Sequence, residues 1–344
     1  MTLPAIKGRI DGSFMPDPPL VDNFGRTINY VRLSLTDKCN LRCLYCMPEN
    51  MRFMPTDKLL SFEELERLMR LLAKMGISKV RLTGGEPFIR PGIMPFLHTL
   101  KAIPGIRDIH ITTNGVSTLP FVEELAQMDI AGINLSLDTL DRKRFKEITR
   151  RNSFDKVMEC FKAILRAGIP LKVNMVVMEQ WNTDSLLPMA ELVEEHPIEV
   201  RFIEEMPFNG TAATKATLNW NHKKILSVLQ ERYPEIRPIP MPPHSTAQQY
   251  FVSGHAGKLG IIAGFSRTFC GTCNRIRVTA SGGMQTCLYG LETLNFRDLM
   301  RNDHSDAEIQ QKLRQQIGSR FKDGIEAQKY VSSNKSRSMS LIGG

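Results

Sequence analysis

Six short runs rich in Val, Ile and Leu alternate with helical patterns between residues 30 and 206. An alternation of this length predicts a parallel sheet whose strands are joined by crossover helices. An incomplete (β/α) barrel and an open doubly wound sheet both fit this pattern. The predicted strands are Tyr30–Thr36, Lys79–Thr83, Asp108–Thr113, Gly132–Leu137, Leu171–Met178 and Val200–Met206.

The clearest helical pattern covers residues 61–75. Ser61 is a suitable N-cap, and Glu64 follows three residues later, which is the spacing of a capping box. Apolar side chains then recur at helical spacing, and Gly76 can take the left-handed conformation that ends a helix. A second helix is predicted over residues 154–167, just before Gly168.

The alternation stops after Met206, and this break divides the chain. Residues 207–249 contain scattered prolines, and two glycine-flanked, strand-like runs follow at residues 258–265 and 275–280. We therefore predict three parts, which are a leader over residues 1–22, a barrel core over residues 23–207 and a C-terminal region over residues 208–344.

Three cysteines follow the first predicted strand in the pattern C-x3-C-x2-C, at Cys39, Cys43 and Cys46. Ligands of α/β folds bind at the C-terminal ends of the strands, where this chain also carries GGEP, TTNG, SLDT and EEMP. Zinc sites usually use four ligands in paired C-x2-C units. Three cysteines without a nearby fourth favour a 4Fe–4S cluster with one iron open to another ligand, and a redox-active or zinc-binding loop is the alternative.

A second set of three cysteines, Cys270, Cys273 and Cys287, forms C-x2-C-x13-C. From spacing alone, His255 can complete a zinc site here, so zinc and an iron–sulfur cluster both stay open. The seventh cysteine, Cys160, lies on the predicted helix of residues 154–167 and is expected to be a buried core residue.

The 344-residue chain has a net charge of +9 and a pI near 9.2. This balance suits anionic partners such as nucleic acid, phosphorylated small molecules or an anionic membrane surface. No apolar run approaches the roughly 20 residues of a membrane-spanning helix, and the first residues lack a signal-peptide pattern. We therefore expect a cytoplasmic protein, in which clustered cysteines indicate a metal or redox role rather than disulfides.

Several longer motifs join these features together. They are DNFGRTINYVRLSLTDKCNLRCLYCMP, VRLTGGEPFIR, NLSLDTL, RFIEEMPF, FCGTCNRIRVTASGGMQTCL and the terminal Gly343-Gly344. Over residues 22–344 the chain resembles the GTP 3′,8-cyclases, the molybdenum cofactor biosynthesis protein A family of the radical S-adenosylmethionine (SAM) superfamily. One departure is Leu41, where that family has an aromatic residue, at a position that is not a ligand.

The resemblance implies an incomplete (β/α)6 TIM-type barrel with a C-terminal extension that carries a second Fe–S cluster. It implies SAM as a cofactor and two 4Fe–4S clusters, one held by each set of three cysteines. In such enzymes an electron from the first cluster cleaves SAM, and the resulting 5′-deoxyadenosyl radical takes the 3′ hydrogen of GTP before C3′ bonds to guanine C8. No catalytic side chain is therefore expected. The implied SAM contacts are Tyr45, Gly85, Ser136 and Met206.

The resemblance also implies a GTP site at which the second cluster meets guanine. Period-two alternation puts Arg275 and Arg277 on one strand face and turns Arg81 away from its apolar neighbours. Gly343-Gly344 is expected to approach the active site. The implied partners are GTP, an electron donor such as a flavodoxin or ferredoxin, and molybdenum cofactor biosynthesis protein C as recipient of the product, with no nucleic acid and no membrane. The implied GTP contacts are Arg32, Arg81, Thr112, Lys172, Arg275 and Arg277.

Two other functions compete with this interpretation. A radical SAM enzyme that modifies a peptide or another substrate can also carry an auxiliary cluster, but it does not need several arginines on strands. A zinc-stabilised nucleic-acid-binding protein fits the high pI and the paired cysteines. The strand–helix alternation and the absence of aromatic–basic clusters argue against that second alternative.

Overall fold

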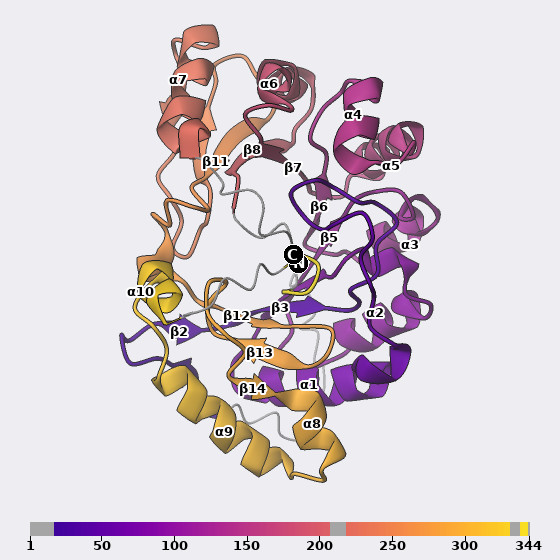
Figure 1. The fold of residues 1–344 in the computed structure, drawn as a ribbon, viewed down its shortest axis with the longest axis vertical. Helices are drawn as coiled ribbons and strands as arrows, with labels where there is room; N and C mark the ends of the chain where they lie inside the picture. Colours follow the sequence, from indigo (N-terminus) through magenta and orange to yellow (C-terminus); the bar gives the residue numbers. More distant parts are fainter. Residues whose placement is uncertain (1–16, 207–217, 331–337, 343–344) are drawn as a thin grey trace, which may run out of the picture.

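The computed structural model describes residues 17–206, 218–330 and 338–342. Within them, a curved sheet of twelve strands contains eight consecutive parallel strands (Figure 1). In spatial order these are β12 (Arg275–Val278), β3 (Tyr30–Ser34), β4 (Lys79–Thr83), β5 (Asp108–Thr113), β6 (Gly132–Ser136), β7 (Leu171–Val177), β8 (Glu199–Glu204) and β11 (Lys258–Ile262). Strands β3 to β8 are the six predicted strands, each with ends within two residues of the prediction.

The sheet is an incomplete barrel, because its terminal strands β9 (Arg237–Pro238) and β14 (Leu294–Asn295) are not paired with each other. The strands β3 to β8 also pair in chain order without a reversal, which confirms the predicted fold class and decides against a doubly wound sheet. Helices cover the outer face of the curve (Figure 1). They are α1 (Phe62–Lys74), α2 (Ile93–Lys101), α3 (Val122–Gln127), α4 (Arg142–Thr149), α5 (Phe154–Arg166) and α6 (Leu186–Glu195).

Helix α1 forms for the reasons that its sequence indicates. The Ser61 side chain accepts the Glu64 N–H while the Glu64 carboxylate accepts the Ser61 N–H, so the predicted capping box is present. The helix buries Leu65, Leu68 and Leu72 against the sheet, and Gly76 follows it at a φ of +94°. A residue with a Cβ rarely adopts that φ, which explains why the helix ends there.

The C-terminal region extends both edges of the sheet instead of forming a sheet of its own. β11 pairs with β8 at one edge and β12 pairs with β3 at the other, both in parallel. The region also contributes β10 (Gln248–Phe251), β13 (Gly283–Gln285), α7 (His222–Arg232), α8 (Phe296–Arg301), α9 (Asp306–Gly318) and α10 (Gly324–Lys329). A hairpin of β1 (Leu20–Val21) and β2 (Thr27–Ile28) precedes the barrel. Short 3-10 helices are Thr56–Lys58, Pro87–Ile89, Leu119–Phe121, Thr183–Ser185, Leu218–Trp220 and Cys270–Thr272.

The core lies between the sheet and its helices, which leaves the inside of the curve polar. Strand β7 shows this alternation, because Val173 and Met175 are fully buried toward the helices while Lys172 and Asn174 point inward. Parallel strands end at the same edge, so the loops after β3 to β8 gather beside this polar interior. In the described ranges, no helix is long and apolar enough to cross a membrane.

Candidate functional site

The first cysteine loop leaves the C-terminal end of β3 and is attached to the end of α4. The Arg42 N–H donates to the Thr149 carbonyl at 2.9 Å, and the Leu44 N–H donates to the Ile148 carbonyl at 3.1 Å. Leu41 is only 3% exposed and packs in the main core, which agrees with a non-ligand role for this position. The loop is therefore held by its backbone, and its three cysteine side chains are half-buried.

Burial dominates the electrostatics of this first cysteine set. It raises the pKa of Cys39 to about 11 and that of Cys46 to about 12, and it raises the pKa of Cys43 well above its usual value. The negative charges of Asp138 and of the neighbouring thiols raise the pKa of Cys43 further, so the three thiols interact electrostatically. Thiolates in this place need added positive charge, which the irons of a cluster supply.

The GGEP loop after β4 lies directly on the cysteine loop. The Gly85 N–H donates to the Thr36 carbonyl at 2.7 Å, and a Cβ on Gly85 would lie 2.1 Å from the Lys38 carbonyl oxygen. This contact between the two loops already requires glycine, whatever binds beside it. Glu86 is fully buried, and its carboxylate accepts hydrogen bonds from the backbone N–H groups of Phe88 at 3.1 Å and Asn114 at 2.7 Å. The second of these bonds joins GGEP to TTNG.

The other predicted SAM residues lie at the same edge of the barrel. The Tyr45 hydroxyl is hydrogen-bonded to buried Asp138 of SLDT, whose pKa burial raises to about 6. Ser136 is the last residue of β6. Met206 follows β8, and a Cβ on Gly264 would lie 3.0 Å from the Met206 sulfur.

The second cysteine set is formed by the turn before β12 and the segment after β13. Burial by itself raises the pKa of Cys273, but Arg275 and Arg320 lower it to about 6. The Cys273 sulfur accepts hydrogen bonds from Arg320 Nη2 at 3.1 Å and from Arg275 Nε at 3.4 Å. Burial raises the pKa of Cys287, and the charges of Cys270 and Cys273 add to the effect, so these three thiols also interact electrostatically.

The fold argues against a zinc site that His255 and the second cysteine set would share. His255 precedes β11, with its Nε2 atom 3.5 Å from Glu194 Oε1, whereas Cys270 and Cys273 precede β12 at the other side of the eight parallel strands. Within residues 17–206, 218–330 and 338–342, no three His, Cys, Asp or Glu side chains are placed to share one metal ion. A single zinc ion holds sulfur ligands within about 4 Å of one another, while a cubane cluster spaces them more widely. Cys160 is fully buried in the core, as predicted.

A row of basic side chains crosses the barrel interior. Arg277, Arg32 and Arg81 occupy paired positions on the adjacent strands β12, β3 and β4, and His110 continues the row on β5. Burial and neighbouring arginines lower the pKa of Arg32 to about 10 and that of Arg277 well below its usual value. The same causes lower the pKa of His110 to about 2, so its imidazole is neutral. A buried row of this kind calls for an anion.

Tyr30 lies at the centre of this basic interior. Its hydroxyl accepts from Arg81 Nε at 2.6 Å, and the Lys79 ammonium lies 5.4 Å from the ring centroid. Burial by itself raises the pKa of Tyr30, but the charges of Arg81, Arg32 and Arg275 lower it to about 7. Thr112, a predicted GTP contact, accepts from Arg81 Nη1 at 3.4 Å.

On the other side of the interior, Lys172 Nζ lies 3.9 Å from Glu199 Oε2. The other oxygen of this carboxylate, Oε1, lies 2.7 Å from Arg201 Nε. Burial and the charge of Arg201 lower the pKa of Lys172 to about 8. The structure thus brings all six predicted GTP residues to one interior and adds residues that the motifs did not indicate. These are Tyr30, Lys79, His110, Asn134, Asn174, Glu199 and Arg201. Period-two alternation from Arg32, Arg81 and Thr112 would have found Tyr30, Lys79 and His110.

Three buried polar atoms of the interior have no hydrogen-bond partner within the described part of the chain. They are His110 Nδ1, Asn134 Oδ1 and Asn174 Oδ1, on three adjacent strands. Unsatisfied buried groups are costly, so their presence beside the basic row is evidence for a polar ligand in this space.

The segment of residues 338–342 lies inside the curve of the sheet (Figure 1). Ser338 Oγ donates to the Cys46 carbonyl at 2.7 Å, and the Met339 N–H donates to the same oxygen at 3.1 Å. Ile342 packs with Tyr289 and Ala327 in an apolar cluster that also includes Cys287 and Met206. The segment therefore links the two cysteine sets. The predicted Gly343-Gly344 lies outside the described residues.

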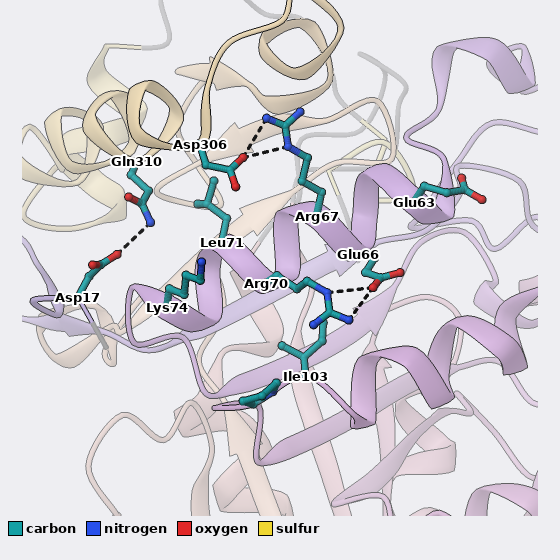
Figure 2. A pocket seen from close by; sticks show the side chains of 11 residues that line it. Asp17, Glu63, Glu66, Arg67, Arg70, Leu71, Lys74, Ile103, Asp306 and Gln310 are labelled. Carbon is teal, nitrogen blue, oxygen red and sulfur yellow. Dashed lines mark hydrogen bonds and ion pairs between the residues drawn. The ribbon is translucent and has the colours of Figure 1, made fainter. Parts of the chain in front are cut away.

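A pocket of about 650 Å³ lies on the outer surface, between α1 and α9 (Figure 2). Its charged side chains are largely paired with each other, since Arg67 binds Asp306 at 2.9 Å and Arg70 binds Glu66 at 2.7 Å. Because four of the seven charged lining side chains are matched in these two pairs and none of the predicted site residues lies here, this pocket is not the candidate site.

Comparison with known proteins agrees with this geometry. Residues 33–193 match the radical SAM superfamily, and residues 198–324 match the family described as Molybdenum Cofactor Synthesis C. The chain is 40% identical over 297 residues to the GTP 3′,8-cyclase of Clostridium perfringens strain 13, covering 86% of this chain and 91% of that one. It is 40% identical over 294 residues to the GTP 3′,8-cyclase of Syntrophomonas wolfei, covering 85% and 90%.

A human relative, molybdenum cofactor biosynthesis protein 1, is 41% identical over 331 residues. This match covers 94% of the chain, but the chain spans only 51% of the human protein. The solved structure of Streptococcus suis SuiB bound to S-adenosylmethionine shares the fold, with a TM-score of 0.58 at 16% identity, covering 82% of this chain and 68% of that one. The fold and the three-cysteine loop thus define a radical SAM protein. Within that superfamily, the chain belongs to the GTP 3′,8-cyclase family.

Proposed function

We propose that this protein converts GTP to (8S)-3′,8-cyclo-7,8-dihydroguanosine 5′-triphosphate, the first step of molybdenum cofactor biosynthesis. The observation that carries the proposal is the buried basic row of the barrel interior. The first cysteine set follows β3 on one side of this row, and Cys270 and Cys273 precede β12 on the other. A triphosphate carries about four negative charges and matches such a row, whereas a neutral peptide does not. This separates the proposal from a peptide-modifying radical SAM enzyme.

In this proposal each cysteine set holds one 4Fe–4S cluster. Cys39, Cys43 and Cys46 lie on a loop fixed by backbone hydrogen bonds, and the burial that raises their pKa values is offset when iron binds the thiolates. Cys270, Cys273 and Cys287 hold the second cluster, with Arg275 and Arg320 beside the Cys273 sulfur. When bound, the first cluster and SAM supply the one-electron chemistry that removes a hydrogen atom from the substrate.

The chain's own residues bind and orient the two small molecules. Tyr45 is fixed by Asp138, and Ser136, Met206 and the backbone of the Gly85 loop complete the SAM side. On the GTP side, six side chains surround the nucleotide and exclude water from it. These are Arg32, Arg81, Thr112, Lys172, Arg275 and Arg277. A buried interior makes each of their charges more effective than it would be in water.

The direct test uses anaerobically reconstituted protein with SAM, a strong reductant and either GTP or ATP. We expect methionine, 5′-deoxyadenosine and a 3′,8-cyclised product with GTP, and no cyclised product with ATP. Iron analysis should give about eight irons per chain, the sum of two 4Fe–4S clusters. Formation of 5′-deoxyadenosine without any cyclised product from GTP would overturn the proposed substrate.

The proposal includes an acidic electron donor such as a flavodoxin or ferredoxin. Arg42 donates to the carbonyls of Cys39 at 2.7 Å and Leu41 at 2.8 Å, so it covers the outside of the first cysteine loop. Nearby, Arg150 and Arg151 share a single carboxylate, Glu49, at 3.3 Å and 2.9 Å. This leaves an excess of positive charge that is complementary to an acidic redox protein.

Charge reversal tests the donor. We expect Arg150→Glu to slow reduction of the first cluster by reduced flavodoxin, and to leave reduction by dithionite unchanged. Equal rates with flavodoxin for the wild type and Arg150→Glu would exclude this docking face.

The proposal also includes transfer of the product to molybdenum cofactor biosynthesis protein C and a cytoplasmic location. Both rest on the family relationship. A coupled assay tests the first, and cell fractionation tests the second.

A further inference from the structure

Three charged side chains lie behind the second cysteine set. Asp22 and Arg26 belong to the β1–β2 hairpin, and Arg320 follows α9. Their side chains are 0%, 8% and 3% exposed. The Asp22 Oδ2 atom lies 2.6 Å from Arg26 Nε and 3.9 Å from Arg320 Nη1. Residues nearly 300 positions apart in the chain therefore meet in one buried group.

The two arginines hold the backbone on which the cysteines lie. Arg26 donates to the carbonyls of Cys270 at 3.2 Å, Phe321 at 2.8 Å and Lys322 at 2.6 Å. Arg320 donates to the Cys273 carbonyl at 3.0 Å, the Cys273 sulfur at 3.1 Å and the Arg275 carbonyl at 3.0 Å. The forked guanidinium makes these contacts with two nitrogens, which the point charge of lysine cannot reproduce.

One carboxylate does not balance the positive charge of this group. Two buried guanidinium groups face one carboxylate, Asp22, and a buried cation without a partner is strongly unfavourable. The Cys273 sulfur is the remaining acceptor of Arg320 that can carry negative charge. The group is thus built for an anionic sulfur, as in a thiolate bound to iron.

We propose that Arg320 is a positioning residue of the second cysteine site, which orients Cys273 and donates a hydrogen bond to the sulfur that ligates the second cluster, while the Asp22–Arg26 pair fixes Arg320 in place. The inference rests on the proposed function only in that the second set must hold a cluster. Hydrogen bonds to ligand sulfurs and nearby positive charge favour the reduced state of a cluster. Arg320 therefore raises the reduction potential of the second cluster.

The test compares Arg320→Gln, Arg320→Lys and a control, Arg314→Gln. Arg314 lies on α9 close in sequence, but it is half-buried and donates hydrogen bonds to the Pro18 and Pro19 carbonyls, away from the cysteines. Iron and sulfide content and the potential of each cluster, followed by electron paramagnetic resonance, are measured on reconstituted full-length protein. We expect Arg320→Gln either to lose the second cluster, from about eight to about four irons per chain, or to keep it at a lower potential.

Arg320→Lys should give an intermediate potential, and Arg314→Gln should match the wild type. The signal of the first cluster and the thermal unfolding curve show whether each variant is folded. If Arg320→Gln does not fold, the potential of the second cluster in Arg320→Lys tests the inference instead. A folded variant at position 320 with both clusters at wild-type potentials overturns the inference. Wild-type protein with only one cluster instead overturns the proposed function, so the two failures are distinguishable.

Discussion

The two cysteine sets use the same number of thiols but differ in the charges that lie beside them. The first lies among backbone groups and near the carboxylates of Asp138 and Glu86, and the pKa values of its thiols are raised. In the second, Arg275 and Arg320 lower the pKa of Cys273 to about 6, against the effect of burial. Of the six thiols, only Cys273 has a lowered pKa, since burial also raises those of Cys270 and Cys287.

The difference is connected to the substrate side of the barrel. Arg275 contacts the Cys273 sulfur and also contributes to the lowered pKa of Tyr30 in the basic interior. The second set therefore shares its positive charge with the proposed triphosphate site, while the first set lies near the carboxylates of Asp138 and Glu86. This suggests that the first set is built for electron transfer to SAM and the second for binding the nucleotide.

The largest expected effect separates these two roles. We expect Cys43→Ala to abolish SAM cleavage, because the first cluster loses a ligand. Cys273→Ala should still form 5′-deoxyadenosine but no cyclised nucleotide. Both products are measured by liquid chromatography and mass spectrometry, with Cys160→Ala, a core substitution that costs about 1 kcal/mol, as the control. Loss of SAM cleavage in Cys273→Ala protein, with the first cluster intact, would break the comparison.

Arginines of the basic row should matter next. Arg32→Ala or Arg277→Ala removes one charged hydrogen-bond donor from the interior, which costs about 1.5–3 kcal/mol and weakens GTP binding about 10- to 100-fold. Isothermal titration calorimetry with anaerobic protein measures this effect. Exposed Arg70→Ala is the matched control, and equal Kd values for Arg32→Ala and Arg70→Ala would contradict the assignment.

Tyr30 gives a pH-dependent effect in the nucleotide-free protein. Its pKa is lowered from 10 in the unfolded chain to about 7, so its stabilisation is fully present above pH 10 and is lost as the pH falls to 7. One proton accounts for at most about 1.4 kcal/mol per pH unit. We expect the Tm of the wild type to rise relative to that of Tyr30→Phe between pH 7 and 9. Parallel Tm curves would show that Tyr30 stays protonated.

A smaller effect is expected near the first cysteine set. Asp138→Asn removes a buried negative charge beside Cys43 and Tyr45, which should raise the potential of the first cluster and lower the rate of SAM cleavage a few-fold. Potentiometric titration checks the sign, which is opposite to that expected for the second cluster in Arg320→Gln. A downward shift in Asp138→Asn protein would remove the electrostatic contrast between the sets.

The smallest effect is expected outside the barrel. Arg67 and Asp306 form an exposed ion pair beside the pocket of Figure 2, with side chains 39% and 56% exposed. Arg67→Ala should cost less than about 1 kcal/mol in the free energy of unfolding and leave GTP cyclisation unchanged. Chemical denaturation measures the first quantity. A large loss of activity would give this outer surface a functional role.

Much of the site could be predicted because its signals are local. The six strands, the capping box at Ser61 and the spacing of Cys39, Cys43 and Cys46 are all short-range patterns. The alternation also placed Arg275 and Arg277 on one face. The same rule reaches Tyr30 and Lys79, which lie two positions before Arg32 and Arg81 on the same strand faces.

His255 shows where spacing misleads. Its distance in sequence from Cys270 suits a zinc site, but His255 precedes β11 whereas Cys270 and Cys273 precede β12, and these two strands lie at opposite sides of the eight parallel strands. Local spacing cannot show this, because the order of strands in a sheet is decided by tertiary packing.

The sequence alone determined the parallel barrel core and the two sets of three cysteines, since strand periodicity and ligand spacing act over a few residues. Only the tertiary structure decided how the C-terminal region completes both edges of the sheet, and that Arg26 and Arg320 support the second cysteine set. The physical reason is that buried charges must find partners wherever the fold brings them. Arg26 meets Lys322 across 296 positions, a pairing that no local pattern encodes.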